Sequence, residues 1–530
     1  MTVSLKRLFL VAITLLVIPL LGLSLWSSLT EPQITDRLQL YQTDLLLHVN
    51  ELQVDDPQDA NLLAARKAVL GNDPLKTALE QYQDVRQSAA TNLQKFQQQL
   101  PAPAASDDPI AAPTAPIPST QDKLQNSQTL TNIQKQSDLL QQLDLRIGLL
   151  QADQDNIQPA LATWAKLTQS GNPPSQSAQL ANVLTGLWSE PPQIFPNAEE
   201  LLQKQLEGWF RYKALSRLYQ LQQRTEALNT LEDQEQQVAQ QTLVKLALVS
   251  TVPTLGAVIG VALIVWLSIR WLLGAGQSRE TTGSLAWQVP WDWEVIAWVL
   301  IVGFFFAGQI AIPGLLGIGS RILSQVGISA SLAAVGGRAK AFYTLTYYLL
   351  MAGTGLFVLY RAVKPFSPLA NDWFRLTGKR NWFLWGLGGY FVALPLMFAV
   401  SLVNQQFWQG QGGSNPLLQI VLEEGDPVAL LIFFFTAAVA APIFEETLFR
   451  GFLLPSLTRY LPVWGAIGVS SLIFATAHLS LSEVLPLTTL GIVLGTVYTR
   501  SRGLLASMLL HSLWNSVTMI GLFILGSGVE

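Results

Sequence analysis

The sequence has no cysteine and only three histidines among its 530 residues. Without cysteine there can be no disulfide bond, no thiolate nucleophile and no zinc site built on thiolates. Charged residues are also scarce, at 13% of the chain, and the formal net charge is −4. So small a charge gives no support to nucleic-acid binding, and we expect no nucleic-acid partner.

Two familiar motifs are missing as well. No H-E-x-x-H sequence occurs, which excludes the common signature of helical zinc proteases. No glycine-rich phosphate-binding loop occurs either, so we expect no ATP-driven step.

Hydrophobic residues dominate instead, making up 50% of the chain. A membrane-spanning helix needs about 20 mostly apolar residues. Runs of that kind fall near 8–26, 243–273, 293–318, 341–360, 382–403, 427–449, 464–481, 484–499 and 503–525. The sequence therefore predicts an all-α fold, a polytopic helix bundle with about nine spans, integral to a lipid bilayer.

The composition divides the chain into four regions. Residues 1–28 form an N-terminal membrane anchor, and residues 29–242 a soluble, glutamine-rich helical domain with a Pro/Ala linker at 101–120. Residues 243–292 hold the second span and its loop, and residues 293–530 the polytopic core. Apolar spacing in the soluble domain favours a helical hairpin or a short coiled coil. The stretch 209–212 is faintly similar to a tetratricopeptide-repeat helix, but no second copy follows at the period of about 34 residues.

Loop charges predict how the chain crosses the membrane. Lys6 and Arg7 precede the first span and place the N-terminus in the cytoplasm, which puts residues 29–242 outside it. The loop 361–381 is basic and expected inside, whereas 404–426 has no Lys or Arg and is expected outside. One loop, 319–340, disagrees because it holds three basic residues on the expected outer side.

Tryptophan and glycine residues near the spans indicate where the helices meet the membrane surface and where they pack on one another. Tryptophans stand near predicted span ends, as an interfacial aromatic belt requires. These are Trp287, Trp291, Trp293, Trp382, Trp385 and Trp464. The pairs Gly256/Gly260 and Gly491/Gly495 have the small-xxx-small spacing that indicates close helix packing.

The stretch 444–455 carries charges at the end of an apolar run. Glu446 and Arg450 are four residues apart, so on a helix they share a face and can pair. Glu445 lies about 100° round the helix and has no local partner. Charged groups inside a membrane are costly and usually paired or functional. Glu445 is therefore a candidate general base.

Later spans add imidazole and carboxamide groups. Phe474 and His478 share a helix face, as do His511 and Asn515. At 1.5 Å per residue, all these polar groups lie about 12–24 Å into a core about 30 Å thick. Singly, each has a structural explanation, such as a satisfied buried histidine or an asparagine joining two helices. Every ionisable or imidazole group of the last five expected spans belongs to the set, however, and together they suggest a site.

This combination of groups suits hydrolysis. A carboxylate and an imidazole can deprotonate a water molecule. Imidazole and carboxamide N–H groups can donate to a developing oxyanion. The alternative is a divalent metal such as zinc, held by Glu445, His478 and His511 with a bound water. The residues alone leave both open, and no cofactor is certain.

The motifs E-E-T-L-F-R at 445–450, F-A-T-A-H at 474–478 and H-S-L-W-N at 511–515 stand in a fixed order. They resemble the EExxxR, FxxxH and HxxxN motifs of the CAAX prenyl protease and bacteriocin-processing (CPBP) family, also called the Abi family. The resemblance is specific over 427–525, and we expect it to extend from 293. It does not cover the soluble domain.

The resemblance implies an intramembrane endopeptidase that is glutamate- or metal-dependent. Carried over by position, Glu445 would be the base, and His478 would orient and activate the water. His511 and Asn515 would stabilise the oxyanion. Glu446 and Arg450 would shape the site or meet the substrate. The expected substrate is a peptide or membrane protein, and residues 29–242 could bind a protein partner.

Two other classes fit the sequence less well. A non-catalytic membrane scaffold or immunity-type protein would use its extracytoplasmic helical domain to bind partners, but all six motif residues are intact. A transporter with an intramembrane proton relay would have broken helices in two matched halves, and no such pairing is visible.

Overall fold

The computed structural model describes residues 5–29, 34–53, 64, 66–67, 69–71, 73–99, 120–168, 175–273, 286–325, 336–377, 381–408 and 412–526. Every regular element in these ranges is helical, which confirms the all-α prediction. The linker expected at 101–120 lies, apart from its last residue, outside the described residues. The chain divides into two compact units, residues 1–34 with 248–527 and residues 35–247 with 528–530. The expected soluble domain thus falls almost wholly in the second unit.

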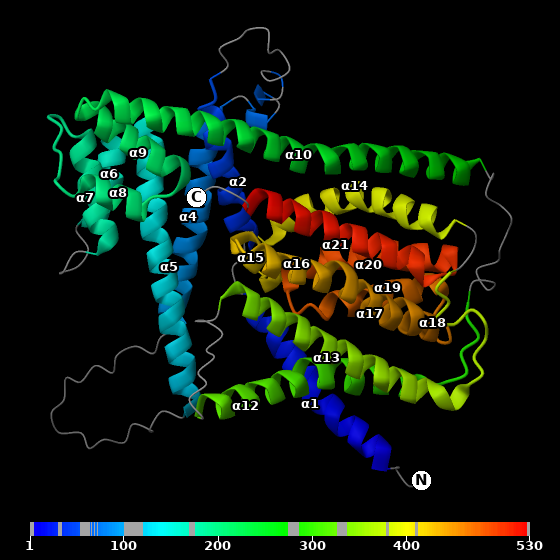
Figure 1. Ribbon diagram of the computed structural model, residues 1–530. Coiled ribbons are helices and arrows are strands. Elements are labelled where there is room, and N and C mark those ends of the chain that lie inside the picture. Colours follow the sequence, from blue (N-terminus) through cyan, green and yellow to red (C-terminus); the bar gives the residue numbers. More distant parts are fainter. Residues whose placement is uncertain are drawn as a thin grey trace, which may run out of the picture. The chain divides into compact units, whose positions relative to one another are not determined.

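The second unit is built from one long helix pair and several short helices (Figure 1). Its elements are α2 (Ile34–Asn50), α4 (Pro74–Gln99), α5 (Thr120–Asp153), α6 (Ile157–Thr168), α7 (Gln176–Trp188), α8 (Ala198–Gln205), α9 (Gly208–Leu221) and the first part of α10 (Thr225–Leu272). Trp164 and Trp209 are fully buried in its core. The Trp164 indole sits on Gly148, where a Cβ would lie 2.1 Å from its Nε1 atom. Glycine at this position therefore lets α5 and α6 approach closely.

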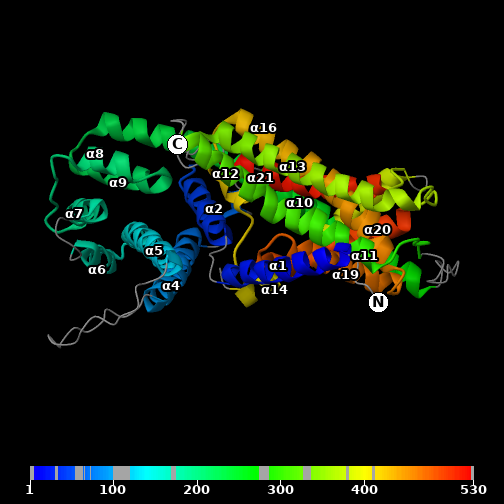
Figure 2. The same cartoon turned by 90° about the horizontal axis from the view of Figure 1, so that it is seen from below.

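The first unit is a bundle of long helices with shorter helical segments between them (Figures 1 and 2). It begins with α1 (Leu5–Ser28), the apolar part of α10, α11 (Trp293–Ala297), η2 (Trp298–Ala311), α12 (Ile312–Gln325), α13 (Gly337–Val363) and η3 (Lys364–Phe366). It continues with α14 (Trp382–Trp408), α15 (Pro416–Glu423), α16 (Pro427–Phe435), η4 (Thr436–Ala440), α17 (Ala441–Glu445), η5 (Glu446–Leu453), α18 (Leu454–Leu457), α19 (Val463–Thr476), α20 (Leu481–Ser501) and α21 (Leu504–Gly526). The segments η2, η4 and η5 are π-helical, and η3 is a 3₁₀ turn.

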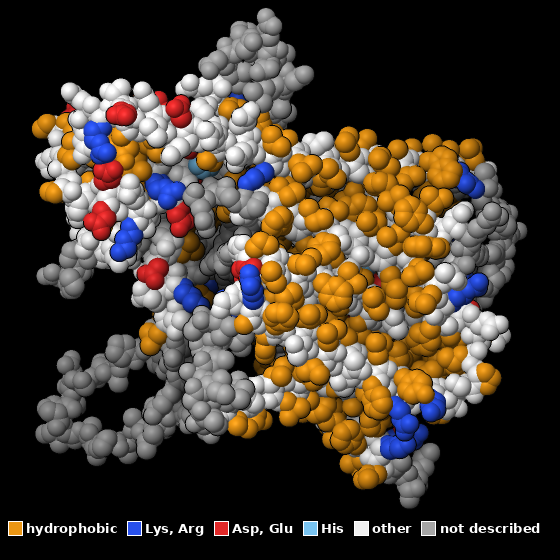
Figure 3. Space-filling model, in the orientation of Figure 1, with side chains coloured by type: hydrophobic (Ala, Val, Ile, Leu, Met, Phe, Trp, Pro, Cys, Tyr) orange, Lys and Arg blue, Asp and Glu red, His pale blue; other side chains and the backbone are white. Residues whose placement is uncertain are grey.

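Eight helical segments of the described residues are long and apolar enough to cross a membrane. Apolar side chains accordingly cover much of the face of this unit shown in Figure 3. The chain is an integral, multi-pass membrane protein. The expected span at 464–481 is the 14-residue helix α19, about 21 Å long and shorter than a full span. The total of nine spans stays a prediction.

Two tryptophans are not where the aromatic belt was expected. Trp291 is 1% exposed, donates through Nε1 to the Ser456 hydroxyl at 2.9 Å and packs on Trp373. Trp287 is also buried and stacks on Tyr498. The expectation was wrong for both, because proximity to a span end does not distinguish a lipid-facing indole from one that packs inside the bundle.

The close packing predicted from the glycine pairs is confirmed. A Cβ on Gly260 would lie 1.9 Å from the Phe391 carbonyl oxygen of α14. A Cβ on Gly491 would lie 2.7 Å from Ser471 Cβ of α19. Glycine in these helices therefore allows backbone-to-backbone approach, as in other small-residue membrane interfaces.

Gly260→Ala should destabilise the first unit by about 1–3 kcal/mol, because the added methyl group meets a backbone atom that cannot rotate away. The measurement is thermal unfolding of the purified protein in detergent micelles. Gly388→Ala, in the partner helix α14, is the matched control because nothing lies within 4 Å of the place its Cβ would take. Equal unfolding temperatures for the two variants would contradict the packing argument.

Candidate active site

A proline inside the sixth expected span removes one backbone donor from the helix, which leaves one carbonyl without its usual partner. Pro442 has no N–H, so it cannot bond the carbonyl four or five residues before it. Those carbonyls belong to Ala438 and Ala437. The Ser512 hydroxyl donates to the Ala438 oxygen at 2.6 Å, and Asn515 Nδ2 donates to the Ala437 oxygen at 2.7 Å. Two side chains of α21 thus bond to backbone carbonyls one turn before the proline.

The ion pair predicted from the spacing of Glu446 and Arg450 is present and buried. Arg450 Nη1 lies 2.8 Å from Glu446 Oε1, and the side chains are 1% and 0% exposed. His511 Nδ1 donates to the same carboxylate oxygen at 2.9 Å. Arg450 also lies over the Phe474 ring, with its guanidinium carbon 4.5 Å from the centroid. Glu446 Oε1 therefore holds both Arg450 and His511, whereas Glu446 Oε2 is buried with no hydrogen-bond partner among the described residues.

The neighbouring carboxylate, Glu445, is engaged differently. Its Oε1 atom accepts a hydrogen bond from the Tyr348 hydroxyl of α13 at 3.0 Å. Its Oε2 atom is buried and has no hydrogen-bond partner among the described residues. His511 Nε2 lies 3.9 Å from it, beyond hydrogen-bond distance. One carboxylate oxygen is thus anchored, and the other can accept a proton.

His478 lies just beyond the end of α19 rather than inside a span. Its Nδ1 atom is 3.0 Å from the Phe474 carbonyl oxygen, which can only accept, so Nδ1 carries the proton. The neutral ring then has its lone pair on Nε2. The Phe474 ring packs edge-on against both imidazoles, with centroid distances of 5.1 Å to His478 and 5.9 Å to His511.

Four of the six sequence-predicted residues line one cavity of about 480 Å³, namely Glu445, His478, His511 and Asn515. Glu446 and Arg450 are not in its lining and lie buried behind it. The cavity opens between helices that are far apart in the sequence, and Tyr348 and Phe449 contribute to its wall. A carboxylate, a basic imidazole nitrogen and N–H donors around one cavity are the groups that water-mediated hydrolysis requires.

Comparisons with known proteins concern this same part of the chain. Residues 427–517 match the family described as "Type II CAAX prenyl endopeptidase Rce1-like". Over these residues the chain is similar to the CAAX prenyl protease family. The chain is 28% identical over 138 residues to YdiL of Bacillus subtilis (strain 168), whose name describes a membrane peptidase, covering 26% of this chain and 55% of that protein. It is also 28% identical over 143 residues to the membrane-embedded CAAX protease MroQ of Staphylococcus aureus (strain USA300), covering 26% and 56%.

The chain spans only about half the length of these two curated relatives. No solved structure matches the chain with significance. The family match covers all three motifs at 445–450, 474–478 and 511–515. It does not include the second unit.

The metal alternative for this site is not supported by the side-chain arrangement. Within the described ranges, no group of three or more His, Asp or Glu side chains lies close enough to hold a metal ion. Glu445, His478 and His511 therefore do not form a ligand set here, and we derive no step through a metal.

Three polar residues that line the cavity were not found by sequence reasoning. Tyr348 belongs to α13, outside the motifs. Gln309 donates through Nε2 to the Ala477 carbonyl at 3.0 Å, and its Oε1 atom is buried without a partner among the described residues. Glu483 accepts from the Asn415 backbone N–H at 2.6 Å. Since α20 begins at Leu481, Glu483 is inside a span, and the expectation that the motif set holds every ionisable group was wrong.

Proposed function

We propose that this chain is an intramembrane endopeptidase that hydrolyses peptide bonds with a water molecule activated by Glu445 and His478. The observation that carries the proposal is the single cavity lined by both side chains together with His511 and Asn515. The family match over 427–517 and the two peptidase relatives support the same activity.

In the proposed reaction, the water oxygen attacks the peptide carbonyl carbon and its proton passes to Glu445 Oε2. His478 Nε2 accepts the second hydrogen bond of that water and so orients it. The proton held on Glu445 then passes to the amide nitrogen as the C–N bond breaks, which yields a carboxylic acid and an amine. Tyr348 keeps the other Glu445 oxygen in place.

The oxyanion of the tetrahedral intermediate needs N–H donors. Asn515 donates one Nδ2 hydrogen to Ala437 and retains a second for this purpose. His511 can donate from Nε2 only when doubly protonated, because Nδ1 already faces Glu446. Glu446 would hold His511 in that orientation by accepting from Nδ1, with Arg450 paired to the same carboxylate, rather than touch the substrate.

The proposed substrate is a peptide or membrane protein within the bilayer, and a prenylated tail is one candidate. We propose an orientation with the N-terminus in the cytoplasm and residues 29–242 outside it, from the basic residues before the first span. A metal-independent reaction is proposed because Glu445 and His478 can activate water by themselves.

Comparative peptidomics of cells producing the parent chain or His478→Ala tests the activity and finds the substrate. His478 is only half-buried and bonded to one backbone carbonyl, so the variant should still fold. Peptides present only with the parent chain would support an endopeptidase. Identical peptide sets, with both chains equally abundant in the membrane, would favour the non-catalytic scaffold instead.

Tyr348→Phe should lower kcat by about 10- to 100-fold and leave KM nearly unchanged, since one hydrogen bond to a charged group is lost. The phenyl ring keeps its packing, so thermal unfolding should change little. Tyr343→Phe, on the same helix but outside the cavity lining, is the matched control. An unchanged kcat for Tyr348→Phe would remove its positioning role.

A further inference from the structure

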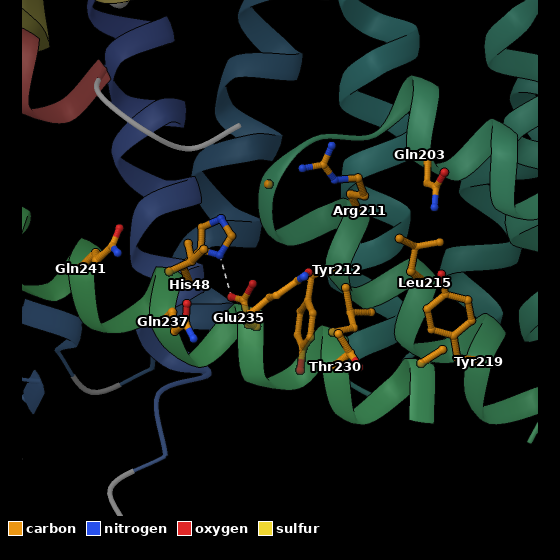
Figure 4. A pocket seen from close by; sticks show the side chains of 15 residues that line it. His48, Gln203, Arg211, Tyr212, Leu215, Tyr219, Thr230, Glu235, Gln237 and Gln241 are labelled. Atoms are coloured by element: carbon orange, nitrogen blue, oxygen red, sulfur yellow. Dashed lines mark hydrogen bonds and ion pairs between the residues drawn. The ribbon is translucent and has the colours of Figure 1, made fainter. Parts of the chain in front are cut away.

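The second unit contains a larger cavity, of about 760 Å³, that no motif or family match covers. It lies between α9 and the first turns of α10, with His48 of α2 and Gln203 of α8 completing its wall (Figure 4). All its lining residues belong to this unit. Its volume is in the range of about 300–1,000 Å³ that is usual for ligand-binding sites.

One wall of this cavity carries a buried polar atom without a partner. His48 is 2% exposed, and its Nδ1 atom is hydrogen-bonded to Glu235 Oε1 at 2.6 Å. Its Nε2 atom is buried and has no hydrogen-bond partner among the described residues. Buried polar atoms are nearly always paired, so an unpaired one in a cavity wall indicates where a ligand atom belongs.

Arg211 supplies a cation to the same cavity. Three other cations of α9 and the turn after it, Lys213, Arg217 and Arg224, are each bonded to oxygen atoms of neighbouring residues. No side-chain partner of Arg211 is found in the described ranges of the chain. The acidic residue of the lining, Glu235, is already bonded to His48. The cavity therefore presents one uncompensated positive charge, which favours an anionic ligand that a guanidinium can grip with two N–H groups.

The remaining lining suits an extended peptide. Gln203, Gln234, Gln237 and Gln241 bring amide groups that both donate and accept, as a peptide backbone does. Leu215 and Leu231 provide apolar surface for side chains. Burial raises the pKa of Tyr212 to about 12, so its hydroxyl stays protonated as a donor.

We infer that the cleft between α9 and α10 binds an extended peptide segment that carries a carboxylate. Arg211 would form an ion pair with the carboxylate, and His48 Nε2 would form a hydrogen bond with a polar atom of the peptide. Binding at this site does not require catalysis by the first unit, so the inference is independent of the proposed function. Such a site would let the second unit bind a protein partner.

The test is fluorescence anisotropy with three fluorescein-labelled pools of short randomised peptides lacking other acidic residues. One pool has a free C-terminus, one an amidated C-terminus, and one an amidated C-terminus with an internal aspartate. The full-length protein is used in lipid nanodiscs, as Glu445→Gln so that hydrolysis cannot consume the probes. At least one carboxylate pool should bind more tightly than the amide pool without aspartate, and which pool does so identifies the carboxylate.

Arg211→Gln should weaken that binding by about 10- to 100-fold, as expected for a lost charged hydrogen bond. Arg217→Gln removes the same charge from α9 outside the cleft and should leave binding unchanged. Thr230→Trp, at an exposed lining position, should block all pools without changing charge. No binding by the protein with an unaltered cleft, equal affinity for acid and amide pools, or binding insensitive to Arg211→Gln or Thr230→Trp would each overturn the inference.

Discussion

Glu445→Gln should lower the rate of peptide-bond hydrolysis by about 10²–10⁴-fold, the usual contribution of a positioned general base. Glutamine keeps the size of the side chain and can still accept the hydrogen bond from Tyr348, so the cavity should keep its shape. It cannot take a proton from water at the position of Glu445 Oε2. The measurement is single-turnover cleavage, by purified protein in micelles, of a substrate found by peptidomics.

The control for this change is Glu294→Gln. Glu294 also belongs to the first unit, but it forms an ion pair with Arg7 at 3.0 Å on the surface. Loss of the Glu294 charge should leave the cleavage rate unchanged. His478→Ala should act in the same direction as Glu445→Gln. Equal turnover by Glu445→Gln and the parent chain would remove the catalytic role of this carboxylate.

Arg450→Met should lower the free energy of unfolding by about 3–5 kcal/mol, because it leaves the fully buried Glu446 without its counter-charge. The guanidinium also donates to the Gly491 carbonyl of α20 at 3.3 Å and covers the Phe474 ring. Its loss therefore loosens contacts among three helices. The measurement is denaturant or thermal unfolding of the purified protein, with the yield of monodisperse protein as a second readout.

The double variant Glu446→Gln with Arg450→Met separates charge from packing. The introduced glutamine would still accept the hydrogen bond from His511 Nδ1, and no unpaired charge would remain buried. We expect it to recover much of the stability lost in Arg450→Met, since a neutral replacement of a buried pair is often tolerated. Arg7→Met, which breaks an exposed pair, should cost less than about 1 kcal/mol. A single Arg450→Met variant as stable as the parent chain would contradict the structural role of the pair.

Local spacing was sufficient to predict several contacts. The Glu446–Arg450 pair follows from two residues four apart on one helix. The close approach at Gly260 follows from small residues four apart in an apolar run. In both cases the periodicity of a single helix determines which side chains share a face. Because an unsatisfied polar group is costly in a bilayer, polar side chains on that face are expected to be paired, and small ones to pack against a neighbouring helix.

Contacts between distant helices could not be predicted in this way. Tyr348 bonds to Glu445 across 97 positions of the chain, and no motif joins them. The resemblance implied that Asn515 stabilises an oxyanion, and the structure shows that it also donates to the Ala437 carbonyl, which joins α21 to the helix that carries Pro442. A proline in an apolar run is the signal that could have indicated this, because its missing N–H always leaves an acceptor for a neighbour.

The organisation of the second unit was foreseen only in outline. Helical periodicity is confirmed by α2 to α9, but no pattern in the chain indicated that His48, from the first of the unit's helices, would pair with Glu235 of the last. Spacing within one helix carries no information about which of several similar amphipathic helices will be its neighbour.

The early end of α19 has a consequence for how water would reach the proposed site. At about 21 Å, this helix stops short of the far membrane surface, and the chain turns through Leu479 in a left-handed conformation (φ 58°) before α20 begins. Non-helical backbone at such depth persists only when shielded by protein or wetted. Here Ser480 and Ser482 bond to the backbone of Gly412 and Gly413, which covers one side of the turn. The other side of the break faces the cavity through Ala477 and His478, so the same break that positions His478 leaves room beside it for the water molecule of the proposed reaction.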